Sequence, residues 1–297
     1  MAHTMKETGG CAAMQKHIVV SGGGELRSFA LPMLGENRRI RLDDAGALCA
    51  WGETVFCASG WGDVIWRLDA ERMIPTGLFA GGPGMRRLLL SPDGERLYAL
   101  CTEADSVLLL DAVSGAPLIL NRAGLNPQNI TLDETGDTLA AAAGESGDVL
   151  LLHARTLSLL ARLPMPGMVY DVRLRNGSIY ALCLNEAMTS TLVTVPPCGI
   201  RQMLRLEGMP GALAMCRETL LCATEGFLHA VSMDGTRVLR TEKAAGRADR
   251  MLLAEGRLLL CDSLTENMVM RDRGGRWQRL CPNVRDMCAY FTRDESS

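Results

Sequence analysis

The chain has 297 residues and a formal net charge of −3, which excludes the strongly basic surface typical of nucleic-acid-binding proteins. Its 11 cysteines contain no C-x-x-C pair, which argues against both a disulfide framework and a structural zinc site. No segment approaches the length of a membrane-spanning helix, and residues 1–16 lack the apolar core of a secretory signal. We therefore expect a cytoplasmic protein with no metal, no cofactor and no membrane contact.

The N-terminal part predicts a disordered lead-in over residues 1–15, followed by one domain over residues 16–297. Three short strands are expected at its start, with three consecutive glycines at one of the turns. These strands cover residues 17–21, 26–31 and 38–42.

A turn glycine then recurs along the chain. Gly52, Gly94 and Gly136 are spaced 42 residues apart, and Gly177 follows 41 residues later. The next two steps fall on Glu218, where the glycine is missing, and on Gly256. A period of about 40–45 residues containing several strands is the signature of a β-propeller. Six repeats follow from this phase: residues 45–84, 85–128, 129–169, 170–211, 212–248 and 249–284.

The repeat at residues 85–128 shows four strands, expected at residues 87–90, 96–101, 106–111 and 117–121. Its first turn, Ser91-Pro92-Asp93-Gly94, has the residue types that a tight turn requires. One last strand is expected at residues 286–292. Together with the three N-terminal strands it makes a seventh blade and closes the ring, which removes exposed sheet edges. The fold class is therefore all-β, a seven-bladed β-propeller whose N- and C-terminal strands share the closing blade.

Two segments resemble the YVTN-type β-propeller repeat family: residues 90–98, with their Pro-Asp-Gly turn, and residues 107–115, with their V-x-x-x-D strand. The repeats at residues 129–169 and 170–211 match in part, through residues 133–136 and 179–181. Cys101 stands near the position where the family usually has asparagine. The resemblance implies a seven-bladed fold and carries little about function.

The first strand of each propeller blade lines the central channel, so the residue just before it is expected at the channel mouth. Five of the seven such positions are polar; the seven are Ala47, Arg87, Asn129, Asp171, Ala212, Arg250 and Asp286, and Tyr170 adjoins Asp171. Convergent polar groups at a mouth are a default ligand site. The alternative is a ring of salt bridges that neutralises itself.

Loops between second and third strands are expected on the same face and carry acidic residues around one tryptophan. The predicted partner-binding face comprises Trp61, Asp63, Glu103, Glu145, Glu186 and Glu266. An acidic rim favours a basic partner, and an exposed tryptophan is a common interface anchor. The alternatives are ordinary solvated turns, and packing of Trp61 on a neighbouring loop.

The sequence contains no recognisable catalytic set. His17, His153 and His229 are expected in separate blades, away from the channel. We therefore favour a monomeric, non-enzymatic binding or scaffold protein that uses one propeller face for a protein partner or a ligand. The alternative is a small-molecule-binding protein or a hydrolase- or lyase-like enzyme. Arg87 and Arg250 would then hold an anionic group, with Asp171 or Asp286 as base or metal ligand and Tyr170 as proton donor.

Overall fold

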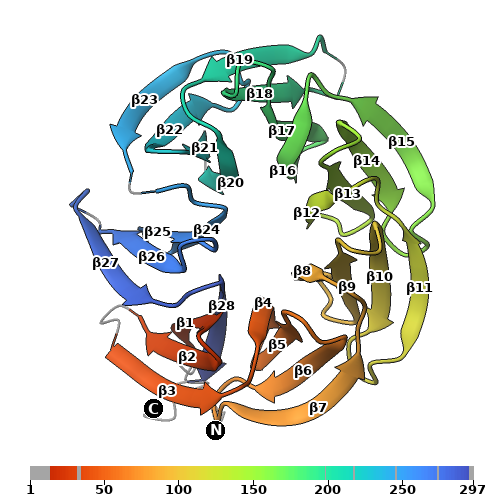
Figure 1. The fold of residues 1–297 in the computed structure, drawn as a ribbon, viewed down its shortest axis with the longest axis vertical. Helices are drawn as coiled ribbons and strands as arrows, with labels where there is room; N and C mark the ends of the chain where they lie inside the picture. Colours follow the sequence, from red (N-terminus) through yellow and green to blue (C-terminus); the bar gives the residue numbers. More distant parts are fainter. Residues whose placement is uncertain are drawn as a thin grey trace, which may run out of the picture.

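The described residues form a closed ring of seven four-stranded antiparallel sheets around a central channel (Figure 1). This computed structural model describes residues 14–31, 35–197, 199–216, 218–244, 246–272 and 274–293. Most of the expected lead-in lies outside the described residues, and the first strand begins at Met14.

Each sheet has one strand at the channel, two middle strands and one outer strand. The channel-lining strands are β28 (Asp286–Arg293), β4 (Ala45–Trp51), β8 (Met85–Leu90), β12 (Pro127–Leu132), β16 (Met168–Arg175), β20 (Pro210–Cys216) and β24 (Arg250–Ala254). The second strands are β1 (Met14–Gly22), β5 (Thr54–Ser59), β9 (Arg96–Cys101), β13 (Thr138–Ala143), β17 (Ser178–Leu184), β21 (Thr219–Thr224) and β25 (Arg257–Asp262).

The third strands are β2 (Glu25–Ala30), β6 (Val64–Asp69), β10 (Ser106–Asp111), β14 (Asp148–His153), β18 (Ser190–Val195), β22 (Phe227–Ser232) and β26 (Asn267–Arg271). The outer strands are β3 (Gly35–Arg41), β7 (Ile74–Ala80), β11 (Pro117–Arg122), β15 (Leu159–Pro164), β19 (Gln202–Leu206), β23 (Val238–Lys243) and β27 (Trp277–Pro282).

The closing blade has the strand order β28-β1-β2-β3, as the repeat phase predicts. β28 pairs with β1 over eight residue pairs, from Met14 opposite Arg293 to Ser21 opposite Asp286. The prediction of a seven-bladed propeller closed by both ends of the chain is confirmed.

The apolar core lies between neighbouring blades. One cluster joins Phe56 and Ile65 of the β4–β7 sheet to Leu97 and Leu110 of the β8–β11 sheet. The second strands are buried on both faces because sheets stack on either side of them, whereas the outer strands are largely exposed. Five cysteines of the second strands are fully buried, as expected for small hydrophobic residues: Cys57, Cys101, Cys183, Cys222 and Cys261.

In five blades the turn between the first and second strands contains a glycine that the backbone conformation favours. Gly94 has a φ of 74°, and a Cβ atom there would lie 2.5 Å from the Trp51 ring. The repeating glycines share this left-handed conformation: Gly52, Gly94, Gly136, Gly177 and Gly256. The periodic signal in the sequence therefore reflects a backbone requirement.

Candidate functional site

A β-bulge sets the position of the polar residues at the channel mouth. The pairing of β8 with β9 shifts register between Met85 and Arg87, and β16 shifts against β17 between Val169 and Asp171. β12 has the equivalent shift before Asn129. These three polar residues thus lie inside their strands, not just before them as expected, because a bulge adds one residue to the strand and redirects its side chains.

Asp171 and Asp286 link adjacent blades. The Asp171 Oδ2 atom accepts a hydrogen bond from the Leu213 backbone N–H at 2.6 Å. Its Oδ1 atom accepts from Val172 N–H and from the Asn129 side-chain amide. Asp286 repeats this pattern with the N–H groups of Leu48 and Met287, each at 2.9 Å. Both carboxylates therefore have a structural role, and a role as base or metal ligand stays a prediction.

The structure brings Arg87, Arg250 and Asp286 together. The Arg250 Nε atom lies 3.2 Å from Asp286 Oδ1, and its Nη1 atom lies 3.0 Å from Asp249 Oδ2. Arg87 Nη1 lies 3.8 Å from the same Asp286 oxygen. Burial acts to raise the pKa of Asp249, but the charges of Arg250 and Arg87 and the hydrogen bonds from Ser263 together outweigh burial and hold this pKa below its usual value. Part of the channel mouth is thus a network of ion pairs, as in the alternative prediction of a salt-bridge ring that neutralises itself.

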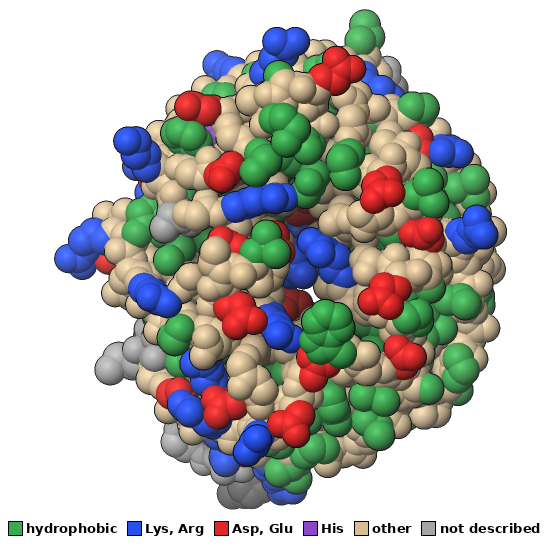
Figure 2. All heavy atoms as spheres, viewed as in Figure 1, with side chains coloured by type: hydrophobic (Ala, Val, Ile, Leu, Met, Phe, Trp, Pro, Cys, Tyr) green, Lys and Arg blue, Asp and Glu red, His purple; other side chains and the backbone are tan. Residues whose placement is uncertain are grey.

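Three further arginines join the mouth. The Arg247 guanidinium stacks over the Tyr170 ring at 4.9 Å, and its Nε atom donates to the Pro210 carbonyl at 3.0 Å. Arg173 Nη1 pairs with Asp171 at 3.3 Å, and Arg86 Nη2 lies 4.0 Å from Asp249. Figure 2 shows basic side chains around and within the central opening, with acidic ones beside them.

The repeat pattern of the sequence does not predict these three arginines at the mouth. Arg86 is the extra residue of the bulge, directly before Arg87. Considering two adjacent positions at the start of each inner strand would therefore have included it. Arg247 lies in the loop that leads into β24. The one sign in the sequence that it belongs to the mouth is that it comes shortly before Asp249 and Arg250. The two alanines of the predicted set, Ala47 and Ala212, are buried and add no polar group.

The loops leading into the inner strands and the loops between second and third strands lie on one side of the ring, which we call the mouth face. Trp61 is 83% exposed on this face, so it does not pack on a neighbouring loop. Its backbone N–H donates to Asp44 Oδ2, which also accepts from Ser59 Oγ at 2.8 Å. Gly62 N–H donates to Ser59 Oγ at 2.6 Å. The loop is thus held while the indole ring faces solvent.

Of the predicted acidic rim, four residues are exposed on the mouth face: Asp63, Glu103, Glu145 and Glu186. Glu266 differs, because it is half-buried and its Oε1 atom lies 3.0 Å from Arg285 Nε. Arg285 also pairs with Asp44 at 3.2 Å. Glu266 therefore belongs to an internal ion-pair bridge, and the rim is less uniformly acidic than its sequence suggested.

The ion pairs of Arg285 with Asp44 and Glu266 join two loops that each carry an exposed apolar side chain. Asp44 anchors the Trp61 loop, and Glu266 lies in the β25–β26 loop, where Leu264 is 81% exposed. Trp61 and Leu264 are therefore exposed apolar side chains on two loops that Arg285 joins. Exposed apolar side chains rimmed by polar residues are typical of interaction sites.

The buried histidines lie within the blades. His229 is hydrogen-bonded to Thr224 at 3.1 Å and to Thr241 at 3.0 Å. His17 stacks on Tyr290 with 4.9 Å between ring centroids. Burial lowers the pKa of both imidazoles below the ordinary value of 6.5. The folded state therefore prefers the neutral form.

This burial predicts a pH dependence of stability. Below about pH 6.5 the unfolded chain binds protons that the folded histidines resist, so stability is lost as the pH falls. We expect a lower urea midpoint at about pH 5.5 than at about pH 7.5, and a smaller difference in His229→Gln. His153→Gln is the matched control, since it leaves both buried imidazoles in place. An unchanged difference in His229→Gln would contradict this assignment.

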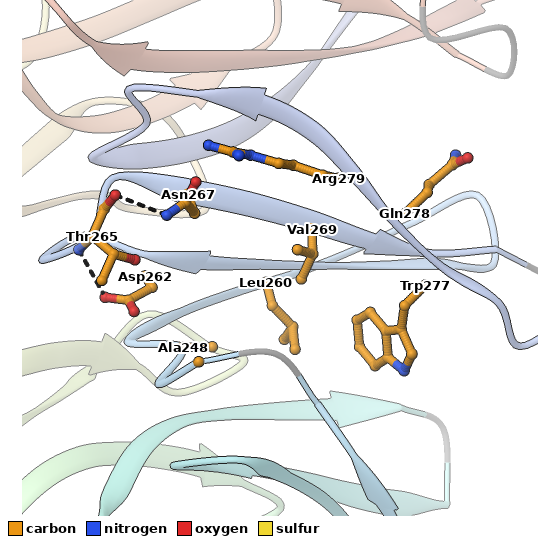
Figure 3. A pocket seen from close by; sticks show the side chains of 10 residues that line it. Ala248, Leu260, Asp262, Thr265, Asn267, Val269, Trp277, Gln278 and Arg279 are labelled. Atoms are coloured by element: carbon orange, nitrogen blue, oxygen red, sulfur yellow. Dashed lines mark hydrogen bonds between the residues drawn. The ribbon is translucent and has the colours of Figure 1, made fainter.

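A groove of about 430 Å³ lies on the β24–β27 blade, beside the loop that leads into β24. Figure 3 shows its apolar walls, Leu260, Val269 and Trp277, and the polar turn in which Thr265 hydrogen-bonds to Asp262 and Asn267. A groove of about 380 Å³ lies at the equivalent place beside β14. Because the groove repeats with the blades, it is a consequence of blade packing.

Within the described part of the chain, no group of three or more His, Cys, Asp or Glu residues is arranged to hold a metal ion. The same residues include no helix long and apolar enough to cross a membrane. The expectations about metals, membranes and cellular location stay predictions.

Comparison with known proteins identifies the fold. A functionally unknown protein from Desulfotomaculum acetoxidans DSM 771 superposes with a TM-score of 0.76 at 12% identity, covering 94% of this chain and 99% of its own. The β-propeller domain of Myceliophteria thermophila Cps50 (Swd1) gives 0.65 at 14% identity, covering 82% and 88%. The dihydro-heme d1 dehydrogenase NirN, in complex with DHE, gives 0.65 at 12% identity, covering 92% and 74%.

No protein-family model matches the chain, and no curated protein matches it in sequence. Membership of the YVTN-type family is therefore not confirmed. The structural neighbours include a protein of unknown function and an enzyme, and identities this low carry the fold alone. The chain is a seven-bladed β-propeller, a fold suited in general to binding or scaffold roles.

Proposed function

We propose that the protein is a non-enzymatic binding or scaffold protein that holds a partner protein on the mouth face. The observation that carries this proposal is the fixed exposure of Trp61. Its loop is fastened by Asp44 and Ser59, yet 83% of the residue remains open to solvent. A preformed loop loses little conformational freedom on binding, which favours affinity.

The surroundings of Trp61 indicate the chemistry of the partner. Leu264 supplies a second apolar contact at the other end of the Arg285 bridge. The exposed carboxylates of Asp63, Glu103, Glu145 and Glu186 lie in the equivalent loops of the ring. A partner with an apolar anchor and basic flanking residues would complement this surface, and its approach would be faster at low salt.

The expectations from the sequence about location, oligomeric state, family and ligands are part of this proposal. The protein would act as a cytoplasmic monomer of YVTN-type ancestry, without nucleic-acid or membrane binding and without a cofactor. The hydrogen bonds that occupy Asp171 and Asp286 support a binding role over a hydrolase- or lyase-like one.

The test is partner affinity in variants of the exposed loops. The partner is identified by chemical crosslinking of the native protein in its own source and then purified. Trp61→Ala is expected to weaken binding by about thirtyfold, the loss for an anchor worth about 2 kcal/mol. Ile200→Ala is the matched control, because Ile200 is 82% exposed in the β18–β19 loop on the opposite face.

Charge reversal tests the acidic residues separately. The double variant Glu103→Lys and Glu145→Lys is expected to slow association and to remove most of its salt dependence. If Trp61→Ala and this double variant both bind the partner like the wild type, the mouth face is not the binding surface.

A further inference from the structure

Four arginines converge at the channel mouth with too few carboxylates to neutralise them. We call Arg86, Arg87, Arg247 and Arg250 the arginine cluster. Among the residues that the structure describes, the carboxylates within ion-pair distance of the cluster are those of Asp249 and Asp286. Arg173 is separate, since it pairs with Asp171. Four positive charges against two negative ones leave an excess of two at this site.

Two of these arginines cross the channel. Arg87 belongs to β8 and Arg250 to β24, two strands separated around the ring by β28 and β4 (Figure 1). Arg87 Nη2 donates to the Asp249 carbonyl at 2.9 Å, and Arg250 Nη2 donates to the Arg86 carbonyl at 3.3 Å. These reciprocal bonds hold two guanidinium groups together despite their like charge.

The cluster also has unused hydrogen-bond donors. The Nε–H groups of Arg86 and Arg87 are buried, and among the described residues neither has an acceptor. A buried donor without an acceptor is costly, so an anionic oxygen that accepts from it would be bound favourably. Burial, and then the repulsion from Arg250, lowers the pKa of Arg87 to about 9. The site therefore lacks negative charge as well as acceptor atoms.

Access to the cluster comes from its two outer members. The Arg86 side chain is 38% exposed, and Arg247 is half-buried above Tyr170. A guanidinium group offers paired N–H donors whose spacing matches the oxygens of a phosphate or a carboxylate.

We propose that the channel mouth is an oxyanion site. Arg86, Arg87 and Arg247 bind a phosphate or carboxylate group, and the buried Arg250 adds positive charge beside them. This goes beyond the proposed partner-binding role, because a free anion would fill the site without any partner. The same chemistry could be supplied by a small molecule or by an acidic group of the partner.

Calorimetric titration of the purified protein with inorganic phosphate, and separately with succinate, tests the proposal at constant ionic strength. At least one of the two anions is expected to bind with one-to-one stoichiometry. Arg86→Met and Arg87→Met are each expected to weaken this binding by at least tenfold. Arg72→Met is the matched control, since Arg72 is exposed in the β6–β7 turn on the opposite face.

Arg86→Met keeps the test decisive if Arg87→Met fails to fold, because the Arg86 side chain is the more exposed of the two. The proposal is overturned if neither anion binds the wild type, or if Arg86→Met binds as tightly as Arg72→Met. Trp61→Ala should retain full anion affinity, so failure here is distinguishable from failure of partner binding.

A competition experiment then identifies the source of the anion. Displacement of the crosslinked partner by the anion that binds would show that the partner supplies the acidic group. Simultaneous binding of both would assign the site to a free small molecule. Either result requires the oxyanion site, and they differ only in its occupant.

Discussion

Replacing Asp286 with alanine is expected to lower the free energy of unfolding by about 3–5 kcal/mol, the loss found when one partner of a buried ion pair is removed. Asp286 is 4% exposed. It is the first residue of β28, and its carboxylate accepts a hydrogen bond from Leu48 of the neighbouring blade. The variant would leave the Leu48 and Met287 N–H groups without their acceptor. It would also remove the carboxylate closest to Arg250 Nε, while that arginine stays buried.

The comparison with asparagine separates charge from hydrogen bonding. Asp286→Asn keeps one carbonyl oxygen for the Leu48 N–H but loses the negative charge, so its destabilisation should lie between those of wild type and Asp286→Ala. Asp43→Ala is the control, because its ion pair with Arg41 is 87% and 86% exposed and such pairs contribute less than about 1 kcal/mol.

Urea unfolding followed by tryptophan fluorescence gives the midpoints and slopes. A midpoint for Asp286→Ala equal to that of Asp43→Ala would show that the closing blade does not depend on this carboxylate.

The fold was predictable because its signals are local and repeat. The turn glycines mark positions with positive φ, and the strands expected at residues 96–101 and 106–111 match β9 and β10 residue for residue. Closure followed from the repeat phase at residue 286, where β28 begins.

The candidate site was predictable only in part. Arg87, Arg250 and Asp286 occupy equivalent positions of inner strands, so the repeat phase placed them together. Arg247 and Arg285 lie in connecting loops, whose conformation does not follow the phase. The anchor of Trp61 is Asp44, from the loop of another strand, and no pattern in the sequence links the two residues.

Truncation of the chain after Arg285 is expected to abolish the folded state, the largest effect that we predict. The deletion removes β28, the channel-lining strand of the closing blade, and leaves eight residues of β1 without their pairing partners. Met287, Cys288 and Tyr290 on this strand are buried, and Tyr290 stacks on His17. Burial of a large side chain such as Met287 or Tyr290 contributes about 1.5–3 kcal/mol, so these two alone account for about 3–6 kcal/mol of a typical domain stability of about 5–15 kcal/mol.

Near-ultraviolet circular dichroism and size-exclusion chromatography measure the loss. A synthetic peptide of residues 286–293, added in trans, is expected to restore part of the native spectrum, because it supplies the missing partner of β1 and so allows the closing blade to form. A peptide of the same composition in scrambled order is the control. Native-like spectra of the truncated chain alone would mean that the ring holds together through the other six blades. The shared closing blade would then stabilise the channel mouth by positioning Asp286 beside Arg250, and not by closing the fold.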